Sequence, residues 1–131
     1  MEEKLVTLET AKLAKEKSFN WSTYMIWMFE YPYYMSEKKD WYHRERNYYC
    51  DIPLHEPWCY SPTQSHLAKW LREIHGIQVY VYSSAKNDEG KYRDYVVYIN
   101  GIAQNDARDE EYQTYEDAME LGLQNALKMI N

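Results

Sequence analysis

One stretch, residues 61–76, constrains the fold of this chain more than any other. Ser61-Pro62-Thr63-Gln64 is typical of a helix start, because serine caps the first turn and proline is tolerated at the first helical position. An apolar stripe follows at helical spacing: Leu67, Trp70, Leu71 and Ile74. Gly76 suits the left-handed residue that ends a helix. The stretch therefore predicts a helix over 62–75 with one buried face.

The residues that follow predict a β-hairpin. Residues 77–82 and 92–99 are rich in Val, Ile and Tyr and alternate in polarity, while 85–91 hold the turn residues Asn, Asp and Gly. We expect antiparallel strands at 77–84 and 92–100, with the more apolar face against helices. Three tyrosines are expected to line the outer face of this sheet or to lie beneath the long loop: Tyr80, Tyr82 and Tyr98.

Two further helices are predicted, over 7–17 with Thr7 as its N-cap and over 114–130 beginning at Thr114. Gly122 lies inside the last helix, where glycine costs about 1 kcal/mol relative to alanine, so we expect a close approach to a strand or helix there. Helices and an antiparallel hairpin in separate blocks indicate an α+β fold. With 131 residues, we expect one small domain over 1–131.

The segment 19–60 has a different character. It contains 14 of the 22 aromatic residues, it lacks a clear period, and Pro32, Pro53 and Pro57 interrupt it. We expect an irregular, aromatic-rich segment there, with short strands around 23–28 and 46–52.

Charge and hydropathy exclude several classes of protein. Residues 103–120 hold seven Asp and Glu and only Arg108 as a basic residue, and this excess equals the net charge of −6 of the whole chain. A chain without a basic stripe is poorly suited to duplex nucleic acid. No apolar window approaches the length of a membrane span, and the first residues lack the features of a secretory signal. We expect a cytoplasmic protein with no membrane partner.

Metal-ligating residue types cluster at four positions: His43, Cys50, His55 and Cys59. Zinc sites normally bring ligands in close pairs such as C-x2-C, and only His55 and Cys59 have a compatible interval. We interpret the two cysteines as reduced thiols, with a single disulfide bridge between them as the alternative, and we expect neither a metal, a cofactor nor catalytic residues. A zinc- or thiol-dependent enzyme is therefore the least favoured of three functional hypotheses; the other two are binding proteins and follow below.

Tyr and Trp are the residue types that dominate protein interfaces. The residues that we assign to partner binding are Tyr33, Tyr34, Trp41, Tyr48 and Tyr49. The first hypothesis is a protein–protein interaction module, whose partner is another protein or a second copy of this chain. The alternative is a binder of single-stranded nucleic acid, which stacks bases on the aromatics and uses basic neighbours: Lys38, Lys39, Arg44 and Arg46.

Three stretches of the chain are similar to a known protein family: Val6–Lys17, Ser61–Ser65 with Lys69–Ile77, and Tyr115–Ala118 with Gly122–Ile130. Their order and spacing resemble those of a family of small uncharacterised proteins from Bacteroidetes bacteria and their phages or prophages. The middle stretch, Pro-Thr-Gln followed by Trp-Leu-Arg-Glu, is the most specific of the three. The resemblance implies a cytoplasmic protein linked to mobile elements, and it implies no activity.

Overall fold

The computed structural model describes residues 4–21, 23, 25–30, 40–45, 58–83, 95–105 and 114–131. The chain divides into two compact units, which are described separately below. One unit joins Met1–Lys4 to Thr63–Asn131, and we call it the C-terminal unit. The other, Leu5–Pro62, is the N-terminal unit. Helices and antiparallel strands occur in both, which confirms the predicted α+β class.

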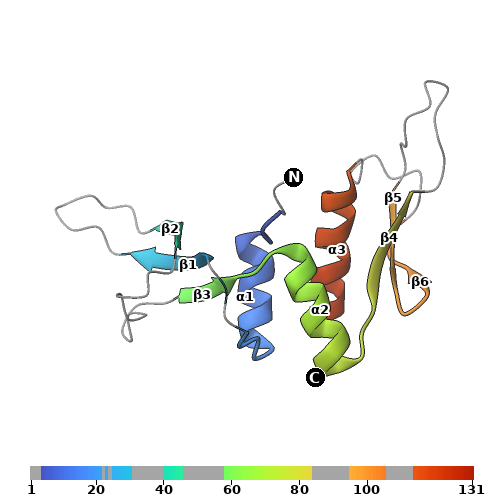
Figure 1. Cartoon of the computed structure of the whole chain (residues 1–131), viewed down its shortest axis with the longest axis horizontal. Coiled ribbons are helices and arrows are strands. Elements are labelled where there is room, and N and C mark those ends of the chain that lie inside the picture. The colour runs from blue at the N-terminus through green and yellow to red at the C-terminus, as the bar shows by residue number, and fades with distance from the viewer. Residues whose placement is uncertain are drawn as a thin grey trace. The chain divides into compact units, whose positions relative to one another are not determined.

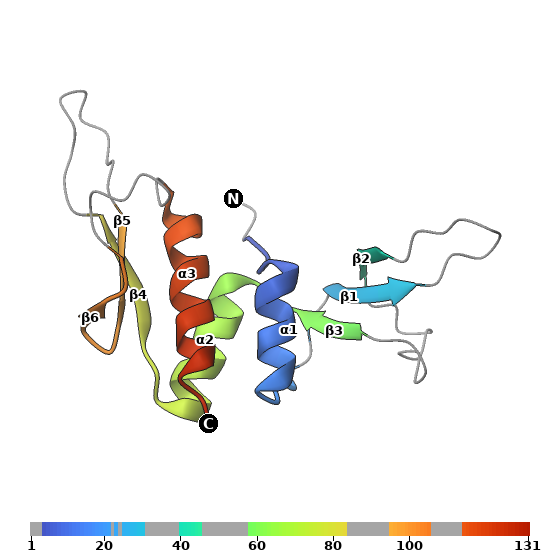
Figure 2. The ribbon, with the colours of Figure 1, turned by 180° about the vertical axis from the view of Figure 1, so that it is seen from behind.

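The C-terminal unit is a layer of two helices on an antiparallel sheet. Its helices are α2 (Gln64–His75) and α3 (Tyr115–Lys128). The described strands are paired in the order β4 (Val79–Ser83), β5 (Tyr95–Ile99) and β6 (Ile102–Ala103). α3 packs on β4 and β5, α2 packs beside α3, and both helices lie on one side of the sheet (Figures 1 and 2). The predicted hairpin is confirmed in the β4–β5 pairing.

Side-chain caps fix the ends of the two helices. The Thr63 hydroxyl accepts a hydrogen bond from the His66 amide at 3.2 Å, and the Thr114 hydroxyl accepts one from the Asp117 amide at 3.1 Å. Gly76 ends α2 with φ 67°, in the left-handed region that glycine adopts without a steric cost. Thr63, and not Ser61, is therefore the N-cap of α2, because Ser61 still belongs to a strand of the other unit.

The core of the C-terminal unit lies between α3 and the sheet. Val97 and Leu123 are fully buried, and Ile99 is nearly so. A Cβ atom at Gly122 would collide with the Val97 side chain and would lie 2.8 Å from Cγ1 of Val79, so the helix reaches the strands because this position is glycine. The close approach expected at Gly122 is confirmed.

Ile74 is the exception to the predicted α2 stripe. Its side chain is 56% exposed, whereas Leu67, Trp70 and Leu71 are buried. Ile74 lies in the last turn of α2, one turn beyond Trp70 and Leu71, and the expectation that it is buried is wrong.

The N-terminal unit contains α1 (Leu8–Glu16), capped by the Thr7 side chain as predicted, and an antiparallel sheet. The described strands are paired in the order β2 (Asp40–Glu45), β1 (Met25–Glu30) and β3 (Trp58–Ser61), and α1 packs against β3. β1 overlaps the strand expected around 23–28. The interpretation of 19–60 as irregular missed β2 and β3, which are held by pairing with β1. The strand expected at 46–52 lies outside the described residues.

Candidate binding surface

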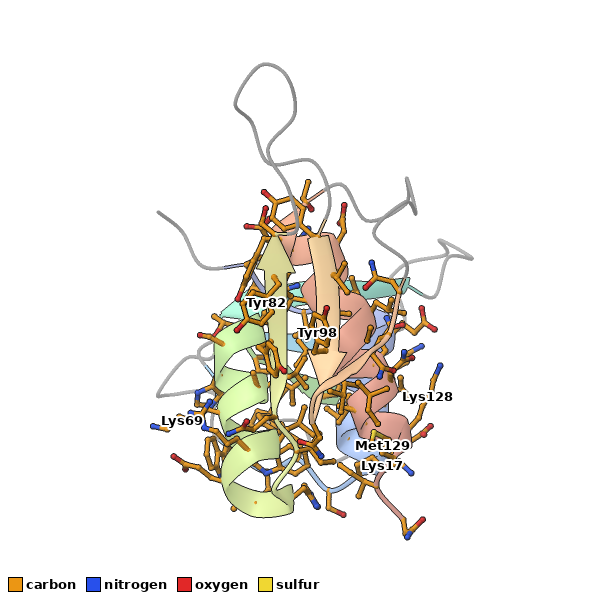
Figure 3. The ribbon with its side chains drawn as sticks, turned by 90° about the vertical axis from the view of Figure 1, so that its right-hand side faces the viewer. Lys17, Lys69, Tyr82, Tyr98, Lys128 and Met129 are labelled. Atoms are coloured by element: carbon orange, nitrogen blue, oxygen red, sulfur yellow. The ribbon has the colours of Figure 1, made fainter. Side chains whose placement is uncertain are left out.

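Three tyrosines lie together on the sheet face that is turned away from α3. In β4, the Val79 side chain approaches α3 at Gly122. Because successive side chains of a strand point to opposite faces, Tyr80 and Tyr82 lie on the face away from α3. Tyr98 is the register partner of Tyr80 on β5. Figure 3 shows Tyr82 and Tyr98 on neighbouring strands with no helix in front of them. We call this surface the tyrosine face, defined by Tyr80, Tyr82 and Tyr98.

Each ring of the tyrosine face contacts the other two. The centroids of Tyr80 and Tyr98 are 5.5 Å apart with the rings stacked at 11°. Tyr82 meets Tyr80 edge-on at 5.3 Å and 87°, and Tyr98 at 5.8 Å and 84°. Stacked and edge-to-face contacts at such distances are the favourable arrangements of aromatic pairs. The rings therefore hold one another in place before anything binds.

The tyrosine face remains partly open to solvent. Tyr82 is 61% exposed, and Tyr80 and Tyr98 are half-buried. Val96, the register partner of Tyr82, is only 6% exposed and belongs to the same face by alternation. The surface thus offers aromatic rings with polar hydroxyl tips above a buried aliphatic residue. This chemistry suits contacts with other side chains or with stacked bases.

The charge of the unit that bears the tyrosine face is unfavourable for nucleic acid. Residues 1–4 and 63–131 contain 13 Asp and Glu against eight Lys and Arg, a formal net charge of −5. The described residues of the unit carry four Asp and Glu and four Lys and Arg, so the whole excess belongs to residues outside the described ranges. A net negative charge on the unit opposes a phosphate backbone at long range.

A buried polar pair links the two helices of the same unit. The side-chain Nε2 of Gln64 donates to Oε1 of Glu120 at 3.2 Å and to the backbone carbonyl of Glu116 at 2.9 Å. Both side chains are buried. The amide of Gln64 thus bonds α3 at two points, which fixes the start of α2 against the first half of α3. The role of this pair is structural, because its hydrogen bonds join α2 to α3 and do not involve the tyrosine face.

Cys59, the described cysteine of the metal-ligand cluster, is buried in β3 with 1% of its surface exposed. Burial raises the pKa of its thiol to about 11, although Lys15 and Lys12 act in the opposite direction. The metal-free thiol is therefore protonated at neutral pH, and this disfavours nucleophilic attack, which requires a thiolate.

The other members of that cluster are not brought to Cys59 within the described chain. His43 and Cys59 are both register partners of Trp27, on opposite sides of β1, so Trp27 stands between them in the sheet. Cys50 and His55 lie outside the described residues. Among the described residues, no three His, Cys, Asp or Glu side chains lie together so that they could hold a metal ion.

The tyrosines assigned to partner binding at 33, 34, 48 and 49 lie outside the described residues, and their assignment stays a prediction. Trp41 is placed by its backbone in β2, opposite Phe29 of β1. The sequence predicts Tyr80, Tyr82 and Tyr98 on the outer face of the hairpin sheet or beneath the long loop, and the structure places them on the outer face. They are not among the residues that the sequence assigns to partner binding. The sequence signal for this surface is the alternation of Tyr80 and Tyr82 with the valines at 79 and 81.

Among the helices that the structure describes, none has the length and apolar character to cross a bilayer. Compared with protein-family models, with curated proteins and with solved structures, the chain matches none of them.

Proposed function

We propose that this protein is a non-enzymatic binding module that contacts another protein through the tyrosine face. The observation that supports this most is the three-ring cluster on the helix-free side of the β4–β5 sheet, with Tyr82 61% exposed. Tyrosine is enriched among the residues that dominate interface energies, because it buries a large area with few rotatable bonds.

A protein partner is favoured over single-stranded nucleic acid by the net charge of −5 on the unit that carries the cluster. The setting that we propose, the cytoplasm of a bacterium that carries phage or prophage genes, rests on the sequence resemblance alone. Tyr33, Tyr34, Trp41, Tyr48 and Tyr49 are part of the proposal as further contact residues.

Site-specific crosslinking tests the proposal. A photoreactive phenylalanine analogue is placed at position 82 in one variant and at position 74 in another, where Ile74 of α2 is similarly exposed at 56%. Each purified variant is irradiated in a bacterial lysate, and adducts are digested separately with protease and with nuclease. We expect protease-sensitive adducts at position 82 in clear excess over position 74.

Two outcomes would contradict the proposal. Equal adduct yields at positions 82 and 74 would show that the tyrosine face is not a preferred contact surface. Adducts at position 82 that are removed by nuclease would assign the face to nucleic acid. A fluorescence anisotropy titration with a labelled single-stranded oligonucleotide at low salt then measures that second activity, because weak electrostatic binding is strongest there.

A further inference from the structure

The backbone groups on the outer side of β4 follow from the ladder that this strand forms with β5. The Asn100 amide donates to the Gln78 carbonyl at 3.0 Å, and the register continues from this pair along β4. In an antiparallel ladder, hydrogen-bonded pairs alternate with pairs whose amide and carbonyl groups point away from the partner strand. Tyr80 and Tyr82 therefore direct their backbone groups to β5. The residues whose backbone groups point to the outer edge are Val79, Val81 and Ser83.

The opposite edge of this sheet is closed by the chain itself. Beyond the short pairing with β6, the Gln104 amide donates to the Val97 carbonyl at 2.8 Å. The side chain of Asn105 then replaces a strand: its Oδ1 accepts from the Val97 amide at 2.9 Å and its Nδ2 donates to the Tyr95 carbonyl at 2.8 Å. The outward backbone groups of Val97 and the carbonyl of Tyr95 are thus satisfied.

The β4 edge has no such closure within the described ranges. β4 is the terminal strand of the sheet, and no described strand pairs with its outer side (Figure 3). On the helix-covered face, Val79 and Val81 of β4 are only half-buried, whereas Val97 and Ile99 of β5 are buried. Proteins normally protect exposed edge strands with charges, prolines or bulges. The sequence of β4, Val-Tyr-Val-Tyr-Ser, contains neither a charge nor a proline, so this edge is suited to pairing with another strand.

The described charges of the C-terminal unit indicate an uncharged occupant of the edge. Its described Lys and Arg balance its described Asp and Glu, so neither an acidic nor a basic segment is favoured. On α2, which Figure 3 shows on the β4 side of the sheet, Lys69 and Glu73 form an ion pair with each other at 4.0 Å. Like charges placed opposite each other in a ladder are destabilising, and two copies of β4 bring none together. A second β4 is therefore an uncharged, alternating strand of the kind that the edge can accept.

We infer that two copies of this chain form a dimer in which β4 pairs with β4 of the second copy, antiparallel about a two-fold axis at Val81. The outward residues are placed symmetrically about that position. Val81 would therefore lie opposite Val81 of the second copy, and Val79 opposite Ser83 of the second copy. All of these would be hydrogen-bonded pairs, because their amides and carbonyls point outward. Every outward backbone group of β4 is then used, and such an isologous contact closes without leaving a new edge.

The tyrosines favour the same register. Tyr80 would lie opposite Tyr82 of the second copy in a non-hydrogen-bonded pair, where the Cα atoms approach to about 4.5 Å. Cross-strand aromatic pairs stabilise sheets, and the Tyr82 ring already meets Tyr98 edge-on at 5.8 Å within one copy. The dimer would thus join two tyrosine faces into one surface to which each copy contributes its three rings. The inference goes beyond the proposed function, because it makes the contact surface the product of two copies.

Sedimentation velocity of the full-length protein measures the association. We expect the wild type to dimerise and Val81→Pro to raise the dissociation constant of the dimer at least about tenfold, because proline removes the outward amide at the axis in both copies. The β4–β5 ladder should survive, since prolines are tolerated on edge strands where the amide faces outward. Val81→Thr keeps the amide and the β-branched shape, and its dissociation constant should stay within about twofold. Circular dichroism and thermal unfolding establish that both variants are folded.

Disulfide formation tests the register without relying on the proline variant. In a Cys50→Ser background, Tyr80→Cys protein is mixed with Tyr82→Cys protein, left to exchange and then mildly oxidised. We expect crosslinked dimers in the mixture, because the two positions would face each other at a Cα separation that a disulfide spans. Each variant alone should crosslink much less, because each position is only a diagonal neighbour of its own counterpart, about 7–8 Å away.

Three results would overturn the inference: a wild type that stays monomeric up to millimolar concentration, a dimer that folded Val81→Pro leaves unweakened, and a mixture that crosslinks no more than the single variants. None of them would contradict the proposed function, because a monomer could still bind a different protein through its tyrosine face. Adducts at position 82 with a second copy are distinguished from adducts with another protein by their mass.

Discussion

The β4–β5 sheet has two faces made from alternate residues of the same two strands. On one face Val79 and Val97 meet α3 at Gly122, and Val97 and Ile99 are buried. On the other face the rings of Tyr80, Tyr82 and Tyr98 contact one another, and Tyr82 is 61% exposed. The two faces differ in what covers them and therefore in what a substitution should change.

The comparison teaches that one β-hairpin can serve folding and recognition separately. A period of two sends neighbouring residues to opposite faces, so the helix-covered face can be close-packed while the other keeps its aromatic rings accessible. Substitutions on the covered face should lower the free energy of unfolding. Substitutions on the tyrosine face should lower affinity for a partner with little effect on folding.

The largest effect is expected from Gly122→Leu. The new side chain would occupy space now filled by the side chains of Val97 and Val79, and α3 would have to move away from the sheet. We expect a loss of about 3 kcal/mol in the free energy of unfolding, measured by urea denaturation. The control is Lys128→Leu, at an exposed position of the same helix, which should change stability by less than about 0.5 kcal/mol. A Gly122→Leu protein as stable as the wild type would contradict the packing of α3 on the strands.

Val97→Ala should have the next largest effect. Val97 is fully buried on the covered face, so the variant loses two methyl groups and leaves a small cavity. We expect a loss of about 2 kcal/mol, from roughly 0.8 kcal/mol for each buried carbon and a further cavity contribution. Binding by the folded variant should be unchanged. Weakened binding without loss of stability would mean that the two faces are not separate in function.

Asn105→Ala tests the closed edge of the sheet. Its side chain satisfies the Val97 amide and the Tyr95 carbonyl, and alanine would leave both without that partner. Because the site is partly buried, we expect a loss of about 1.5 kcal/mol and faster hydrogen exchange at the Val97 amide. Unchanged exchange at Val97 would show that the amide is protected by something other than Asn105.

Tyr82→Ser should have the smallest effect on stability. The substitution removes the two aromatic contacts of the Tyr82 ring. Because the position is mostly solvated, we expect the free energy of unfolding to fall by only about 0.5 kcal/mol. Affinity for the partner recovered by crosslinking at position 82 should nevertheless fall at least about tenfold, as measured by isothermal titration calorimetry. Tyr115→Ser is the matched control, since Tyr115 is 45% exposed but lies on α3 and outside the tyrosine face. Equal losses of affinity in both variants would argue against a localised site.

The C-terminal unit could be predicted from sequence because its signals are local. The capping residues, the helical stripe around Trp70 and the alternation in β4 each lie within one element. Ile74 was assigned to the buried stripe because periodicity alone does not show where the covering elements end.

The sheet of the N-terminal unit could not be predicted in the same way. β3 pairs with β1, whose partner residues lie 30 to 36 positions earlier in the chain, and nothing within Trp58–Ser61 specifies that partner. β2 contains His, Arg and acidic residues without a clean apolar alternation. For the candidate site, the sequence predicts helices against the more apolar face of the hairpin and tyrosines on the other, but not that α3 is the helix that packs on both strands. That fact depends on the tertiary packing at Gly122.

The most direct test of the two-face account is an NMR titration of the full-length protein with the partner recovered by crosslinking at position 82, following the ring signals of all tyrosines. We predict that the signals of Tyr80, Tyr82 and Tyr98 shift together along one binding curve, while those of Tyr115 do not move. Shifts confined to other tyrosines, or a bound partner that leaves all three ring signals unchanged, would contradict the assignment of the tyrosine face as the contact surface.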